Sequence, residues 1–200
     1  CARLLPTRRI ALACSGRSSR RLRVSDDVSD VALELASITR FFGRTKALSS
    51  ATLVARRGTV HALLGENGAG KTTLMRIAFG MIRPDSGSIK VDGSNRVFAS
   101  PSDAIDAGIG MVHQHFTLVP AMTVAENIAL GGHGILSLGR MRKSISELAE
   151  RTGLTIDPDA RVGDLPAGAQ QRVEILKALS RETHILILDE PTAVLTPLEA

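Results

Sequence analysis

The stretch GENGAGKTT, residues 65–73, joins small residues, one lysine and two threonines in an order that can hold a chain of phosphates. A triphosphate must be approached closely by many backbone N–H groups, so side chains in such a bend must be small. Lys71 can then reach the β and γ phosphates, and the Thr72 hydroxyl can bind Mg²⁺. We predict a nucleotide-binding loop rather than an incidental glycine-rich turn. Its predicted ligands are Gly65, Asn67, Gly68, Ala69, Gly70, Lys71, Thr72 and Thr73.

Two acids in ILILDEP, residues 185–191, form the second candidate group. The apolar run predicts a strand, which places Asp189 at the carboxyl edge of a sheet, where α/β folds bind ligands. Asp189 would hold Mg²⁺ through water, and Glu190 would polarise a water for attack on the γ-phosphate. The alternative is an Asp-Glu pair that only caps a loop. Beside the phosphate-binding loop, the catalytic interpretation is the one we favour.

Alternating strand and helix patterns surround these motifs and would position them. Strands are predicted at 31–35, 59–65, 87–93, 109–114 and 184–189. Helices are predicted at 71–80, 100–108, 123–132, 140–152 and after Pro166. Gly80 and Gly153 mark helix ends, and Thr123 with Glu126 fits a capping box. This alternation implies an α/β sheet that is partly parallel.

The segment DLPAGAQQRVEILKAL, residues 164–179, predicts a helix with an unusual beginning. Val173, Leu176 and Leu179 recur at a spacing of three, which indicates a largely buried helix. At the front of the helix, Pro166 stands where a capping hydroxyl is expected, and it lacks a backbone N–H. One interpretation is that Pro166 only begins the helix, a position that prolines favour.

Charge is unevenly distributed along the chain. The 200 residues include 25 Lys or Arg and 20 Asp or Glu, a net charge of +5. Residues 1–25 hold seven arginines and no acid, which leaves 18 basic against 20 acidic side chains in the rest. The remainder is therefore not a basic surface for nucleic acid, and we expect no nucleic-acid partner. No apolar run approaches the ~18 residues needed to span a bilayer.

Residues 1–30 are predicted to be a disordered basic tail. Their Arg-rich and Ser-rich composition fits an organelle transit segment, a disordered extension or a misplaced start, since no Met opens the chain. We favour the last two interpretations. Cys1 and Cys14 both lie in this tail, so we expect neither a disulfide framework nor a thiol metal site in the folded part.

Four stretches, in this order, resemble the ATP-binding subunits of ABC transporters: GENGAGKTTLM, MVHQHFTLVPAMTVAENIALG, LPAGAQQRVEILKAL and ILILDEPTAVLTPLE. The resemblance covers residues 31–200. The stretches HQHFTLVP, QQRVEILKAL and EPTAVLTPLE are most similar to the first ATPase half of nucleoside and simple-sugar importers. The resemblance implies an α/β fold, with a P-loop NTPase (RecA-like) core, a small antiparallel β subdomain and a helical subdomain.

The resemblance also implies boundaries within residues 31–200. Residues 31–122 would form the core and the antiparallel β part, 123–175 the helical subdomain with the signature segment, and 176–200 the return to the core. The family has a phosphate-sensing histidine roughly 30 residues beyond the catalytic glutamate. The sequence ends at Ala200, before that position. We therefore expect a domain that is incomplete at its C-terminus, as a fragment or the product of a truncated gene.

The resemblance assigns roles to two further residues. Phe42 matches the aromatic residue that stacks on adenine; the alternative is a core residue at a strand end, and we weigh the two equally. Gln114 matches the glutamine that touches Mg²⁺ and the attacking water, so the predicted metal ligands are Thr72, Gln114 and Asp189. His113 and His115 flank it, but no third ligand is visible and we take them as structural. His61 and His184 are predicted to be core residues.

The helix that begins near Pro166 matches the signature segment, which in the family contacts ATP held by the opposite subunit. Its predicted members are Leu165, Pro166, Gly168 and Gln170. Leu165 and Gly168 keep the pattern Leu-Ser-Gly-Gly-Gln, whereas Pro166 removes a hydroxyl. A lost hydrogen bond to a charged group is worth ~1.5–3 kcal/mol. If that bond acts fully in the transition state, turnover falls by roughly 10- to 150-fold.

The function implied by the resemblance is an ATPase subunit of an importer for nucleosides or simple sugars, with ATP and Mg²⁺ as cofactors. Its expected partners are a second ATPase domain and a membrane permease, and its expected location is the cytoplasmic face of the membrane. One alternative is a nucleotide-binding module or fragment with little turnover. Another is a soluble ABC ATPase that takes no part in transport.

Overall fold

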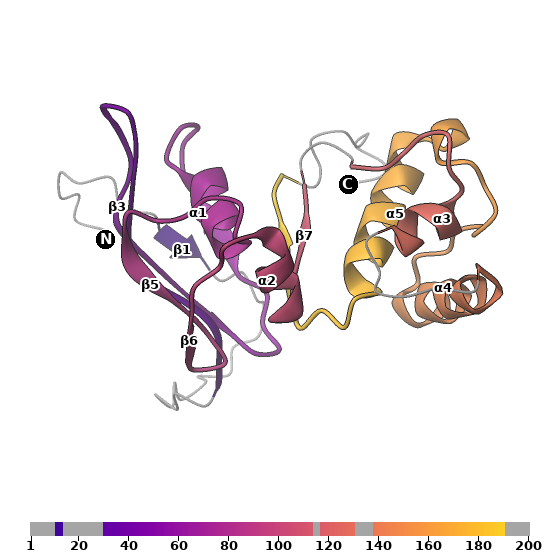
Figure 1. Ribbon diagram of the computed structural model, residues 1–200, viewed down its shortest axis with the longest axis horizontal. Coiled ribbons are helices and arrows are strands. Elements are labelled where there is room, and N and C mark those ends of the chain that lie inside the picture. Colours follow the sequence, from indigo (N-terminus) through magenta and orange to yellow (C-terminus); the bar gives the residue numbers. More distant parts are fainter. Residues whose placement is uncertain (1–10, 14–29, 114–116, 131–137, 191–200) are drawn as a thin grey trace. The chain divides into compact units, whose positions relative to one another are not determined.

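The computed structural model describes residues 11–13, 30–113, 117–130 and 138–190, which fall into two compact units that divide after Ala107 (Figure 1). The first unit contains β1 (Ala11–Ala13), β2 (Val31–Phe42), β3 (Thr45–Arg56), β4 (Ala62–Leu64), α1 (Lys71–Ala78), β5 (Ser86–Val91), β6 (Ser94–Arg96) and α2 (Pro101–Asp106). The second contains β7 (Ile109–Val112), α3 (Val124–Ala129), α4 (Leu138–Thr152), the 3-10 turn η2 (Val162–Asp164), α5 (Ala167–Leu179) and β8 (Ile185–Leu188).

A four-stranded antiparallel sheet in the order β3-β2-β5-β6 dominates the first unit. Alternate apolar side chains of its strands are buried, among them Leu33, Leu35, Leu53, Ile89 and Val91. The sequence predicted a strand at 31–35, but β2 runs to Phe42, and β3 was not predicted at all. Register shifts interrupt the pairing of β2 with β3, so the period-2 pattern that identifies a strand is broken.

A glycine allows β5 to lie close to β2 where their register shifts. Gly87 has φ +106, and a Cβ there would lie 2.7 Å from the Ala36 oxygen and 2.8 Å from the Ile38 Cα. Both are backbone atoms that cannot move aside, so only glycine fits. The start of β5 is thereby fixed against the middle of β2.

Helix α1 follows β4 through the glycine-rich loop. It buries Leu74, Ile77 and Ala78 and ends at Ala78, two residues before the predicted stop at Gly80, which has φ +74. A Cβ on Gly80 would lie 2.6 Å from the Ser100 oxygen, so the chain turns there against the beginning of α2. Strand β4 is shorter than the predicted 59–65, and it pairs antiparallel with β1.

The second unit contains a pair of parallel strands, in agreement with the prediction of a sheet that is partly parallel. Strands β7 and β8 run in register from Ile109 opposite Ile185 to Val112 opposite Leu188. His184 is exposed just before β8, with its N–H 2.8 Å from the Gly108 oxygen, so the prediction that it is a core residue is wrong. Two parallel strands that are in register end at the same edge of the sheet.

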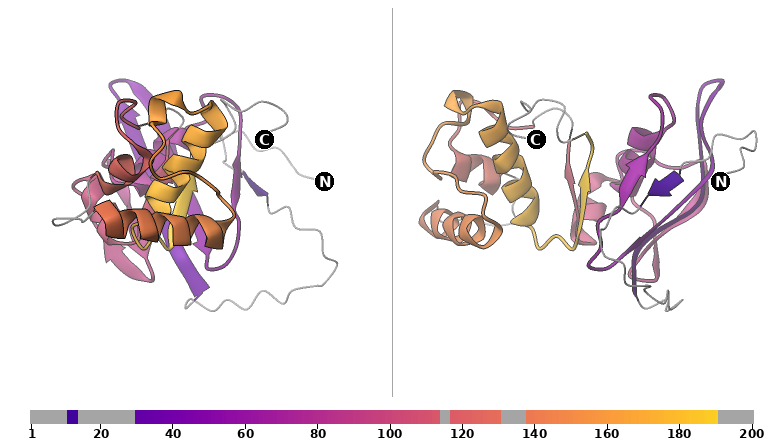
Figure 2. Two further views of the ribbon diagram at one scale, coloured as in Figure 1. Left: turned by 90° about the vertical axis from the view of Figure 1, so that its right-hand side faces the viewer. Right: turned by 180° about the vertical axis from the view of Figure 1, so that it is seen from behind.

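Three helices of the second unit share one apolar core, and Figures 1 and 2 both show them side by side. Its central residues include Val124 and Ile128 of α3, Ile145 of α4, and Val173 and Leu176 of α5. The predicted helices at 123–132, 140–152 and after Pro166 are thus confirmed. Helix α4 begins two residues earlier than expected, and α3 ends at Ala129.

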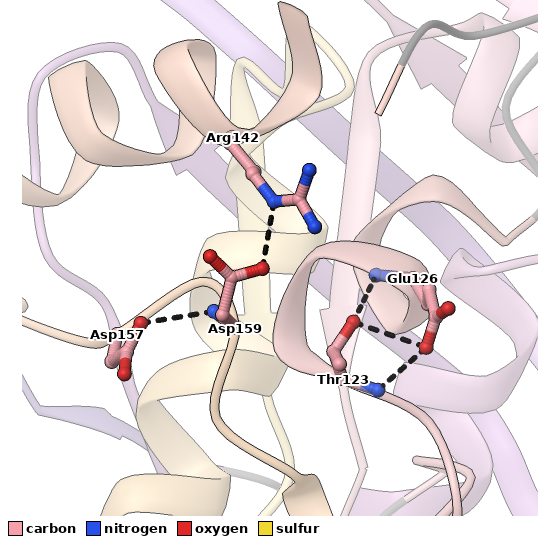
Figure 3. A network of polar contacts seen from close by, with 5 residues as sticks. All are labelled: Thr123, Glu126, Arg142, Asp157 and Asp159. Atoms are coloured by element: carbon pink, nitrogen blue, oxygen red, sulfur yellow. Dashed lines mark hydrogen bonds and ion pairs between the residues drawn. The ribbon is translucent and has the colours of Figure 1, made fainter. Parts of the chain in front are cut away.

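The capping box predicted at Thr123 and Glu126 is present (Figure 3). The Glu126 N–H donates to the Thr123 hydroxyl oxygen at 3.2 Å, and the Thr123 N–H donates to the Glu126 carboxylate at 2.8 Å. In the same region Arg142 of α4 is paired with Asp159 at 2.7 Å. The cap begins α3, and the ion pair joins α4 to the loop that precedes η2.

Two buried polar side chains hold the segment 117–123. Asn127 accepts the Val119 N–H at 2.7 Å and donates to the Val119 and Thr123 carbonyls at 3.0 Å each. The Glu174 carboxylate of α5, 4% exposed, accepts the Thr117 N–H and, at 2.9 Å, the Thr117 hydroxyl. A buried polar group that is fully paired fixes its surroundings. The segment after β7 is therefore fastened to α5 at Thr117.

Candidate functional site

The glycine-rich loop has the backbone that the sequence pattern requires. Gly68 and Gly70 have φ +79 and +92, in the left-handed region. A Cβ on Gly70 would lie 2.7 Å from both the Ala47 oxygen and the Leu48 Cδ2 of β3. The end of the loop is therefore pressed against β3 so closely that position 70 excludes every side chain.

Lys71 folds back over this loop. Its Nζ donates to the Gly65 oxygen at 2.8 Å and to the Glu66 oxygen at 3.1 Å, while the Ala69 N–H donates to the Glu66 oxygen at 3.1 Å. The ammonium group therefore lies on the bend itself, where an anion that binds the bend would meet it.

The beginning of α1 suits a negatively charged ligand. Gly70 is the N-cap and has no side chain with which to cap the helix, and the first turn of the helix contains no acid. The partial positive charge of a helix N-terminus therefore faces a loop of small residues. Thr72 and Thr73 lie in that first turn. This combination fits a phosphate chain.

Asp189 and Glu190 lie together where β8 ends. The Asp189 N–H donates to the Val112 oxygen at 3.1 Å, which extends the β7–β8 pairing by one step. Asp189 is 8% exposed and Glu190 is exposed. Glu190 has φ +50, a conformation that costs a non-glycine residue of order 1–3 kcal/mol and is concentrated at functional sites.

The predicted metal ligands are distributed over both units. Thr72 belongs to the first unit and Asp189 to the second, while Gln114 and His115 lie outside the described residues. Within the described residues, no group of three His, Cys, Asp or Glu could hold a metal. A hydroxyl, an amide oxygen and a carboxylate are oxygen donors of the kind that Mg²⁺ prefers. As residue types, the predicted ligands therefore suit the chemistry of Mg²⁺.

The residues predicted to form the signature segment lie at the N-terminus of α5. Pro166 is the N-cap with φ −63 and ψ 159, one position before the first helical residue, and no side chain caps the helix. Its oxygen accepts the Ala169 and Gln170 N–H groups at 2.9 and 3.0 Å. The Gln170 side chain donates to the Leu165 oxygen at 2.8 Å. Pro166 thus stands at the start of the helix, one residue before the first helical position in which the sequence interpretation placed it.

Phe42 ends β2 with 46% of its surface exposed. The interpretation as a core residue is therefore wrong, and adenine stacking stays a prediction. The Arg40 Cζ lies 5.1 Å from the centre of the Phe42 ring. Phe41 is similarly exposed at 43%, and the Lys46 Nζ lies 5.6 Å from its ring. The end of the β2–β3 hairpin thus presents two aromatic rings, each with its own cation.

His61 precedes β4 and is exposed, and its Nε2 accepts the Arg56 N–H at 3.2 Å. It closes the turn from β3 to β4, so the prediction that it is a core residue is wrong.

Two residues with structural roles, Asp85 and Glu174, were not predicted from the sequence. The Asp85 carboxylate accepts hydrogen bonds from residues of β2. A signal existed for Glu174, because an acid between Val173 and Ile175 interrupts an otherwise apolar helix.

Known proteins match most of the chain. The ABC transporter family profile matches residues 48–193. Nucleoside import ATP-binding protein NupA of Lactococcus lactis is 51% identical over 175 residues, which are 86% of this chain and 35% of NupA. Ribose import ATP-binding protein RbsA 2 of Burkholderia ambifaria is 48% identical over 176 residues, again 86% of this chain and 35% of the relative. The chain thus spans about a third of the length of these curated relatives.

A solved structure supports the same assignment. The ADP conformation of an ATP-binding cassette of an ABC transporter matches with a TM-score of 0.74 and 25% identity, over 84% of this chain and 72% of that one. The α/β fold with a P-loop NTPase core is therefore confirmed, including its antiparallel β part and its helices. The chain belongs to the ABC transporter family.

Proposed function

We propose that the chain is an ATP-binding and ATP-hydrolysing module of an ABC importer for nucleosides or simple sugars. The names of NupA and RbsA 2 support the two solute classes. The observation that carries the proposal is the loop of residues 65–70, pressed against β3 at Gly70 with Lys71 folded across it. That arrangement places small residues, a helix N-terminus and one ammonium group at one bend, which is what a nucleoside triphosphate requires.

The other predicted site residues have proposed roles in holding the metal, in hydrolysis and in binding the nucleotide. A bound Mg²⁺ would supply charge neutralisation on the phosphates, and Thr72, Gln114 and Asp189 would hold it. Glu190 accepts a proton from the attacking water, because its exposed carboxylate follows directly after the buried Asp189. Phe42 stacks on the adenine. Leu165, Pro166, Gly168 and Gln170 face the ATP of a second ATPase domain.

The proposed partners are that second ATPase domain and a membrane permease, and the proposed location is the inner face of the membrane. Among the described residues, no helix is long and apolar enough to cross a bilayer. The solute would then be chosen by the permease and its binding protein. Copurification of the chain with a membrane permease tests the proposed partnership. Failure to copurify with a permease would favour an ABC ATPase without a transport role.

The phosphate-binding loop is tested by Lys71→Ala. We expect this variant to lose nucleotide binding almost completely, because the ammonium group that would neutralise the β and γ phosphates is removed. Titration with Mg-ATP, followed by calorimetry, measures the affinity. Lys143→Ala, which removes a lysine from the exposed face of α4, is the matched control. Unchanged affinity in Lys71→Ala would refute the assignment of the loop.

A second candidate function is a nucleotide-binding module with little turnover. The observation that favours it is the N-terminus of α5, where the N-cap residue Pro166 makes no side-chain capping hydrogen bond and has neither a hydroxyl nor an N–H. ATP binding and phosphate release, measured separately on the same preparation, decide between the two. Tight binding of Mg-ATP without phosphate release, in the presence of the partner domain, would establish the module.

A further inference from the structure

Asp85, one residue before β5, joins two consecutive residues of β2 that directly precede Phe42. Its Oδ1 accepts a hydrogen bond from the Arg40 Nη1 at 2.8 Å, and its Oδ2 accepts the Phe41 N–H at 2.6 Å. The Asp85 N–H in turn donates to the Thr39 oxygen at 2.9 Å. One carboxylate therefore fixes both the backbone that leads to Phe42 and the arginine beside it.

Arg40 connects this carboxylate to the ring. Its Cζ lies 5.1 Å from the centre of the Phe42 ring, within the range of a cation–π contact. Its Nε is buried and has no hydrogen-bond partner among the residues that the structure describes. A buried donor without a partner lowers stability, so such a group calls for an explanation other than stability. Holding the ring is that explanation.

The attachment of Asp85 is rigid. Gly87, two residues further on, lets β5 approach β2 more closely than any other residue would allow. The pairing of Thr39 with Ser86 lies beside it. Asp85 therefore has a fixed place from which to orient Arg40. The Phe42 ring still keeps 46% of its surface exposed, which leaves room for a second planar group.

We propose that Asp85 and Arg40 are positioning residues for the purine base of a bound nucleotide. This inference rests on the proposed function, since it assumes that Phe42 receives the base. Asp85 orients the guanidinium, the guanidinium holds the Phe42 ring in one orientation, and the base stacks on a ring that loses no further freedom on binding. In this proposal the phosphate chain of the nucleotide does not contact Asp85, Arg40 or Phe42.

Comparison of ATP with inorganic tripolyphosphate distinguishes binding of the base from binding of the phosphates, because tripolyphosphate has the phosphate chain alone. The full chain and the variants Asp85→Asn, Arg40→Gln and Phe42→Ala are titrated with each. Asp85→Asn keeps the shape and removes the charge. The matched control is Asp92→Asn, because Asp92 pairs with Arg57 at 2.6 Å on the same sheet with similar exposure.

We expect Phe42→Ala to weaken ATP binding by about 5- to 150-fold, the range for loss of a base–aromatic stack. Asp85→Asn and Arg40→Gln should weaken it by about 2- to 5-fold, the range for an exposed cation–π contact. Tripolyphosphate binding should stay unchanged in all three variants, and Asp92→Asn should bind both ligands as the parent chain does.

Three results would overturn the inference. ATP affinity that is unchanged in Asp85→Asn and Arg40→Gln, while Phe42→Ala loses it, would show that the ring needs no support. An equal loss of ATP and tripolyphosphate binding would show a role in folding alone. A parent chain that binds neither ligand would overturn the proposed function itself, and the inference with it.

Discussion

Pro166 is the residue at which the sequence departs most clearly from the signature pattern. It caps α5 without a side-chain hydrogen bond, and its ring removes the backbone N–H that another residue would offer. Its oxygen nevertheless accepts two hydrogen bonds from the first turn, so the helix itself begins normally. The structural role and the proposed phosphate-binding role of this position are therefore separable.

Pro166→Ser separates them experimentally. We expect ATP hydrolysis to rise by up to roughly 10- to 150-fold in the presence of the partner ATPase domain, because a hydroxyl would again reach the γ-phosphate. The measurement is steady-state phosphate release at saturating Mg-ATP. Ala167→Ser, which places the hydroxyl one residue later, is the control. No gain from Pro166→Ser would mean that the position has little influence on turnover.

Helix α3 shows how a short element is stabilised by its first turn. The Thr123 backbone and side-chain hydrogen bonds hold the pKa of Glu126 below its ordinary value of 4.5, with further help from Arg142 and Arg161. A carboxyl whose pKa is lowered by folding stabilises the folded state above its ordinary pKa. That contribution is lost as the pH falls through the lower, folded value.

This cap gives a prediction with a defined sign. Thr123→Ala should lower the free energy of unfolding by about 1 kcal/mol at pH 7, as for other N-caps. Glu126→Gln keeps the hydrogen-bonding shape and removes the charge, so it should destabilise the protein at pH 7 and lose that effect as the pH falls from 4.5 through the lower pKa of the folded state. Urea unfolding at pH 7, and again at a pH below the folded pKa of Glu126, measures the effect of both variants, with Glu150→Gln on α4 as the control. An equal effect of Glu126→Gln at both pH values would contradict the electrostatic explanation.

Elements with strong end signals were predictable from the sequence. Gly80, the Thr123–Glu126 box and Gly153 mark helix ends that the structure confirms, and the continuous apolar run at 185–188 predicted β8. Strand β3 was missed because its pairing with β2 shifts register, which destroys simple alternation. Glu174 was recognisable as unusual in an apolar helix, but the partners of Asp85 and Glu174 could not be predicted, because they lie 45 and 57 residues away in the chain.

At the scale of the whole molecule, the proposed function requires more than one ATPase domain. The signature segment that faces the bound ATP would come from another ATPase domain. The chain spans about a third of the length of relatives such as NupA, which leaves length for further domains in those proteins. Assembly should therefore depend on ATP rather than on a permanent interface.

Glu190→Gln tests this dependence. We expect it to keep ATP binding and to lower hydrolysis by about 10²- to 10⁴-fold, because the general base is lost. The unhydrolysed ATP should then hold two ATPase domains together, seen as a doubled mass in light scattering. The double variant Lys71→Ala/Glu190→Gln is the control and should stay at the smaller mass. Undiminished hydrolysis would assign the base to another residue.

The contact between Gly70 and β3 limits how this loop can evolve. A larger residue at position 70 would meet the Ala47 carbonyl oxygen as well as the Leu48 side chain. Trimming Leu48 could relieve one collision, but no substitution elsewhere removes a main-chain oxygen. No second substitution can therefore compensate for a larger residue at position 70. We expect phosphate binding by this loop, once lost through such a substitution, to return only when the glycine itself is restored.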